Sequence, residues 1–60
     1  MSGADEIAEC IVRAHGIPQA RTYAEASAWL DNIWPTSREW FGDQMRANVV
    51  EAILSKALVA

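Results

Sequence analysis

Apolar residues recur at helical spacing over residues 3–15 and share one face: Ala4, Ile7, Ala8, Ile11 and Ala14. The opposite face is charged, and Glu9 and Arg13 stand four residues apart on it, a spacing that stabilises a helix. Gly16 follows, and glycine is the residue that most readily ends a helix in a left-handed conformation. The pattern predicts a helix over Gly3–His15, capped at its start by Ser2.

Two threonines mark the starts of two further helices. Thr22 and Thr36 each precede a glutamate by three residues, which is the spacing of a capping box. Pro35 restricts the residue before it to an extended conformation, so the intervening helix must stop there. The sequence therefore predicts helices over Tyr23–Ile33 and Ser37–Leu58.

The predicted C-terminal helix has an unusual distribution of apolar residues. One stripe runs through Phe41, Met45, Val49 and Ile53, and a second runs through Val50, Leu54 and Leu58. A helix that serves a single core usually shows one stripe a little over 100° wide. The middle helix, at about 17 Å, covers only the first half of a neighbour of about 33 Å. We therefore expect some of Val50, Leu54, Leu58 and Val59 to stay bare in a monomer.

Gly42 falls inside this predicted helix. Glycine there costs about 1 kcal/mol relative to alanine. We expect the position to mark either the close approach of another helix or a slight bend.

No strand pattern or hairpin turn is present, so the sequence predicts an all-α fold. We expect one small three-helix domain over residues 1–60 with a long C-terminal helix. A core of this size rarely supplies more than about 3–5 kcal/mol. The single cysteine excludes an internal disulfide, and with one histidine it is too few for a structural zinc. Oligomerisation or tight helix packing is the support that remains.

The composition narrows the classes of partner. Apolar residues make up 52% of the chain, which is typical of a folded domain and too high for a disordered one. The net charge of −3 disfavours nucleic acid and anionic membranes. No apolar run approaches the roughly 18 residues of a membrane span, and the acidic start is unlike a signal peptide. With a lone cysteine, these features predict a cytoplasmic protein.

No group of residues predicts catalysis, a metal or a cofactor. Cys10 and His15 stand five residues apart, about 140° around a helix, and so point apart. We expect Cys10 to be a buried, inert thiol and His15 to interact with the helix dipole. Four carboxylates are expected to be solvated and to have no role as acid–base pairs: Glu6, Glu9, Glu25 and Asp31. The sequence predicts no enzyme and no small-molecule substrate.

Tryptophans bracket the corner between the second and third predicted helices. Trp34 and Trp40 flank it, and Trp29 lies one turn earlier. They form either an aromatic core that closes the corner or an exposed anchor for a partner. We expect Trp40 to be structural, packed on Pro35. Trp34 is the expected exposed anchor, because the proline holds it outside regular helix.

These observations favour a non-enzymatic helical interaction module, expected to be a homodimer, that binds and regulates or inhibits a larger cytosolic protein. In size and composition the chain resembles small acidic helical proteins such as phage-encoded inhibitors and small adaptors. A heterologous protein in place of the second copy is the other possible occupant of the apolar surface. The expected protein interface consists of Trp34, Val50, Leu54, Leu58 and Val59.

A helix-turn-helix DNA-binding regulator is the alternative function. Its recognition helix would present a mixed set of side chains to the groove: Arg38, Glu39, Asp43, Gln44 and Arg46. Two carboxylates in that set oppose phosphate, and the five Lys and Arg residues of the chain do not cluster. The charge pattern therefore favours the interaction module.

Overall fold

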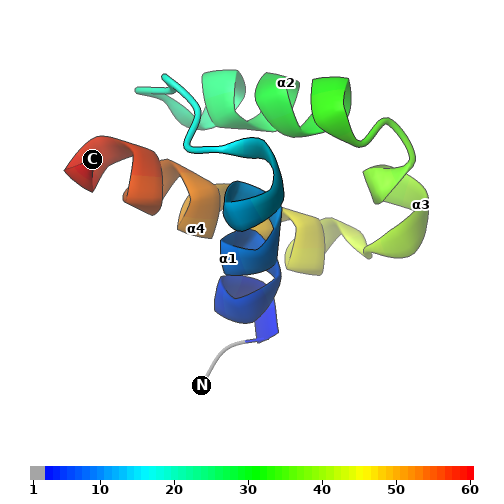
Figure 1. Ribbon diagram of the computed structural model, residues 1–60. Helices are drawn as coiled ribbons and strands as arrows, with labels where there is room; N and C mark the ends of the chain where they lie inside the picture. The colour runs from blue at the N-terminus through cyan, green and yellow to red at the C-terminus, as the bar shows by residue number, and fades with distance from the viewer. Residues whose placement is uncertain (1–2) are drawn as a thin grey trace.

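The computed structural model of the protein describes residues 3–60 and shows an all-α domain (Figure 1). Within those residues there are four helices and no strand: α1 over Gly3–His15, α2 over Tyr23–Ile33, α3 over Ser37–Trp40 and α4 over Asp43–Val59. The predicted bounds of the first two helices are confirmed. Gly16 ends α1 with a φ of 87°, as expected. The predicted cap of α1, Ser2, lies outside the described residues.

The longest helix, α4, organises the domain. In Figure 1, α2 lies alongside α4 and runs in the opposite direction, while α1 crosses both at a steep angle. The most extensive packing is between α1 and α4. Small residues on α1 and α2, such as Ala8 and Ala26, are fully buried and let the helices approach closely. The buried apolar core consists of Ala4, Ala8, Ala20, Ala26, Leu30, Val49, Val50 and Ile53.

The prediction of one continuous helix over Ser37–Leu58 is wrong. The chain leaves α3 at Trp40, and Phe41 is extended with φ −112° and ψ 143°. Gly42 is the N-cap of α4, where its carbonyl oxygen accepts a hydrogen bond from the Arg46 N–H over 2.9 Å. A Cβ atom at Gly42 would meet nothing within 4 Å, so no helix packs closely against it. The glycine begins a helix instead of bending one.

Of the two predicted capping boxes, only that of Thr22 forms, and its glutamate bonds the N–H of Arg21 in place of that of Thr22. Thr22 Oγ1 accepts from the Glu25 N–H over 3.2 Å, and Glu25 Oε1 accepts from the Arg21 N–H over 3.0 Å. Thr36 begins α3 as predicted, but its side chain forms no capping hydrogen bond. With ψ at 6°, Thr36 is not in the extended conformation that a capping side chain needs.

Both apolar stripes of α4 contribute to the core. Val49 and Ile53 from one stripe and Val50 from the other are fully buried, because α1 and α2 pack on different sides of α4. Of the four residues some of which were expected to stay bare, Leu58 and Val59 are exposed, whereas Val50 is in the core. The apolar residues left exposed on α4 lie near its two ends.

Candidate functional site

Three aromatic side chains meet where α2, α3 and α4 join; we call them the aromatic corner. Trp34 lies at its centre, with its ring centroid 5.3 Å from that of Phe41 and 6.2 Å from that of Trp40. Trp34 is half-buried and packs on the core, whereas Trp40 is 73% exposed. The exposures predicted for the two tryptophans are therefore reversed.

The local backbone explains this reversal. Trp34 caps the C-terminus of α2 and donates its N–H to the Leu30 carbonyl oxygen over 2.9 Å, so the chain at Trp34 stays against the helix end. Trp40 ends a helix of one turn, after which the extended Phe41 leads inward to α4. The half-buried ring of Phe41 occupies the position beside Trp34. The indole of Trp40 is thus left on the outside.

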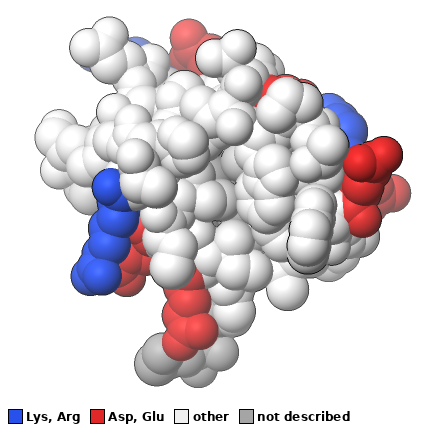
Figure 2. Space-filling view, turned by 45° about the vertical axis from the view of Figure 1, so that its right-hand side comes forward, with Lys and Arg blue, Asp and Glu red and all other residues white. Residues whose placement is uncertain are grey.

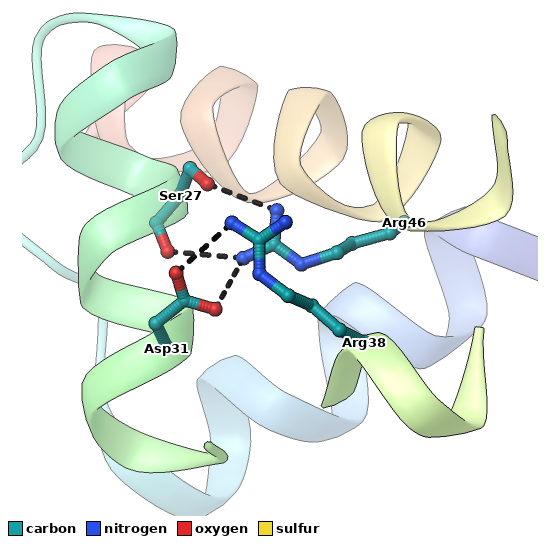
Figure 3. A network of polar contacts seen from close by, with 4 residues as sticks. All are labelled: Ser27, Asp31, Arg38 and Arg46. Atoms are coloured by element: carbon teal, nitrogen blue, oxygen red, sulfur yellow. Dashed lines mark hydrogen bonds and ion pairs between the residues drawn. The ribbon is translucent and has the colours of Figure 1, made fainter. Parts of the chain in front are cut away.

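A buried arginine lies between α2 and α4 (Figure 3). Arg46 is 6% exposed and donates to Ser27 Oγ over 2.9 Å and to Asp31 Oδ1 over 2.6 Å. It also donates to the Ser27 carbonyl oxygen over 3.3 Å. Arg38 from α3 contacts the other oxygen of Asp31 over 3.3 Å. One carboxylate therefore joins three helices.

The surroundings of Asp31 change its acidity. Desolvation raises its pKa, but the hydrogen bonds and charges of Arg46 and Arg38 outweigh that effect and hold the pKa below its ordinary value of 3.8. Asp31 is partly solvated as we predicted, but it is also paired with two arginines, which we did not predict. Arg46 is not free to meet DNA phosphate, which the helix-turn-helix alternative requires.

The sequence did contain a signal for this arginine. Arg46, Val50 and Ile53 follow the i, i+4, i+7 spacing of one helix face, which places a cation in line with buried residues. A buried charge needs a partner of opposite sign. Asp31 is the acidic residue at the end of α2 that meets this need.

An open groove of about 650 Å³ lies at the other end of α4. The connection between α1 and α2, the first turn of α2 and the last turn of α4 form its walls. The lining residues fall into an apolar group and a polar group: Ile17, Pro18, Ala57, Leu58 and Ala60, then Gln19, Arg21 and Glu25.

The residues of the predicted protein interface do not form one exposed surface. Val50 is fully buried, and Trp34 and Leu54 are half-buried against the core. Leu58 and Val59 are 59% and 84% exposed. Of the five predicted interface residues, Leu58 and Val59 are therefore the two that are exposed, and Leu58 also lines the groove.

Cys10 is exposed, so the prediction of a buried thiol is wrong. It stands two residues beyond the buried Ala8, about 200° around α1, and so faces away from the core. His15 is also exposed and presents a ring edge-on to Trp29, with centroids 6.5 Å apart. Among residues 3–60, no cluster of three or more His, Cys, Asp or Glu residues is placed to hold a metal ion.

Figure 2 views the molecule with the side of α3 turned forward. A broad central area of this face has no charged side chains, and the charged ones lie along its edges. Separately, no helix of the described residues has the length and apolar character needed to cross a membrane.

Comparisons of the chain with family models, with curated proteins and with solved structures found no match.

Proposed function

We propose that this protein is a non-enzymatic interaction module that binds a larger cytosolic protein through the aromatic corner and thereby regulates or inhibits it. The observation that carries the proposal is the 73% exposure of Trp40. A tryptophan is among the largest apolar side chains that a chain can bury. Leaving one exposed in a domain of 60 residues forgoes stability that so small a core needs.

The arrangement suits binding because the exposed ring is supported from behind. Trp34 contacts both Trp40 and Phe41, so the ring of Trp40 packs on one side against other aromatic rings. An anchor held in place loses less side-chain entropy when a partner covers it. The exposed indole of Trp40 supports a partner whose contact surface offers an apolar pocket.

Self-association is the second part of the proposal, and its support is narrower than the sequence suggested. Leu58 and Val59 remain exposed, while Val50 is in the core. Burying two aliphatic side chains contributes roughly 1.5–3 kcal/mol each. Association costs about 4–15 kcal/mol. A homodimer would need further contacts, so a heterologous partner at Trp40 is better supported.

The test compares the wild-type protein with Trp40→Ala in affinity capture from the source cell, followed by mass spectrometry. Tyr23→Ala is the matched control, because Tyr23 is an exposed aromatic residue outside the aromatic corner. We expect one stoichiometric protein to be retained by the wild type and by Tyr23→Ala, and lost with Trp40→Ala. With the purified partner, Trp40→Ala should weaken binding about 30-fold or more, the effect of a hot-spot residue. Equal capture by all three proteins would exclude the aromatic corner as the binding surface.

A further inference from the structure

The groove at the end of α4 contains an arginine whose charge is not paired. The chain has four arginines, and Arg13, Arg38 and Arg46 each contact a carboxylate. The guanidinium of Arg21 forms no ion pair or hydrogen bond within residues 3–60; only its backbone N–H is bonded. Arg21 lines the groove and is exposed.

The reason lies in the capping of α2. Glu25 stands four residues after Arg21 and lines the same groove, so it is a candidate for an ion pair. Its Oε1, however, accepts from the Arg21 N–H and from the Thr22 hydroxyl over 3.0 and 3.4 Å. The carboxylate is held at the start of the helix, and the guanidinium remains available to a ligand.

Two exposed aliphatic side chains share this open groove with the cation and with the polar Gln19 and Glu25. Ile17 is 50% exposed and Leu58 is 59% exposed, and Pro18 and Ala57 complete the apolar lining. A volume of about 650 Å³ is within the usual range of ligand sites, about 300–1,000 Å³. A guanidinium binds a carboxylate through two parallel hydrogen bonds, and aliphatic walls favour aliphatic side chains.

We propose that this groove is a second binding site, which accepts a peptide segment of a partner protein that carries one acidic side chain between aliphatic ones. The acidic side chain pairs with Arg21, and its aliphatic neighbours pack on Ile17 and Leu58. A second carboxylate in the segment would meet the charge of Glu25 and be repelled. The site does not include Trp40, so it stands apart from the function proposed for the aromatic corner.

The test is an NMR titration of backbone amide resonances with two peptides, acetyl-Ala-Leu-Glu-Leu-Ala-amide and the same peptide with Gln in place of Glu. We expect the Glu peptide to shift the resonances of the groove residues and to bind about twofold to fivefold tighter than the Gln peptide, the effect of one exposed ion pair. Arg21→Gln should make the two peptides equal. Leu58→Ser should weaken both, and Trp40→Ala should change neither.

Four results would overturn the proposal. The first is an absence of shifts at millimolar peptide, and the second is equal affinity of the two peptides for the wild type. The third is movement of the groove resonances when the protein alone is diluted, which would identify a second copy as the occupant. The fourth is binding of decanoate as tight as that of the Glu peptide, which would identify a site for free fatty acids.

Discussion

Arg46 on α4 donates to Asp31 on α2 over 2.6 Å from a position where its own side chain is only 8% exposed, while the side chain of Asp31 is 38% exposed. The pair therefore joins a charge removed from water to one that water still reaches. Such an arrangement is asymmetric, because losing the exposed partner leaves the buried charge uncompensated.

Replacing Asp31 with alanine should destabilise the protein by about 1–3 kcal/mol. This loss is smaller than that expected for a fully buried ion pair, because solvent screens the charge of Asp31. Arg38→Gln is the matched control, since it removes only the outer contact of the same carboxylate, between side chains 65% and 38% exposed. We expect the control to cost less than about 1 kcal/mol. Urea unfolding followed by circular dichroism measures the stability of both variants. Equal losses would show that the contact with Arg46 contributes no more than the contact with Arg38.

The contribution of Asp31 should depend on pH. Its pKa in the folded protein lies below the ordinary 3.8, so its ionised form stabilises the fold above that value. The contribution is lost as the pH falls below 3.8 and through the folded pKa. The difference in unfolding free energy between the wild type and Asp31→Asn should be constant above about pH 5 and shrink below 3.8. If the difference in unfolding free energy grew as the pH fell, the pKa of Asp31 in the folded protein would have to lie above its ordinary value.

The two threonines at helix starts should respond differently to alanine. Thr22→Ala removes a side chain that accepts from the Glu25 N–H, and should cost about 1 kcal/mol. Thr36→Ala removes a side chain without a capping bond and should change stability by less than about 0.5 kcal/mol. The urea midpoints of the two variants, compared with that of the wild type, test this prediction. A larger loss at Thr36 would mean that its hydroxyl caps α3 in solution.

The tryptophans should likewise separate by stability. Trp34→Ala removes a half-buried ring that packs on the core and on two aromatic neighbours. We expect a loss of about 1–3 kcal/mol, below the range for a fully buried ring. Trp40→Ala should stay within about 0.5 kcal/mol of the wild type, because its side chain is mostly in water. Thermal unfolding of the two variants tests this, and the opposite order would return Trp40 to a structural role.

Gly42 and Gly16 offer a pair of substitutions with opposite signs. Gly42→Ser should stabilise the protein by about 0.5–1 kcal/mol, because it adds a capping hydroxyl and reduces the freedom of the unfolded chain. Its φ of −68° suits any residue, and a Cβ there meets nothing within 4 Å. Gly16→Ala should destabilise by about 1 kcal/mol, because its φ of 87° strains any residue with a Cβ. A loss at Gly42 would mean that serine disturbs the turn from α3 into α4.

The sequence by itself determined α1 and α2, because their ends are defined by local chemistry. Gly16 adopts the left-handed conformation without strain, Thr22 and Glu25 form a capping box, and Pro35 restricts Trp34. Each signal acts within a few residues, so no knowledge of the rest of the chain is needed. The all-α class follows from the same periodicity.

Only the tertiary structure decided the break at Phe41, the burial of Val50 and the pairing of Arg46 with Asp31. A capping pattern at Thr36 and a glycine within an apolar helix are locally compatible with one continuous helix. The broken chain is favoured because Phe41 can then pack on Trp34, and α4 can bury Val50 together with Val49 and Ile53 against α1 and α2. The exposure of Trp40 has the same origin: one indole fits against the core at this corner, and that of Trp34 occupies the place.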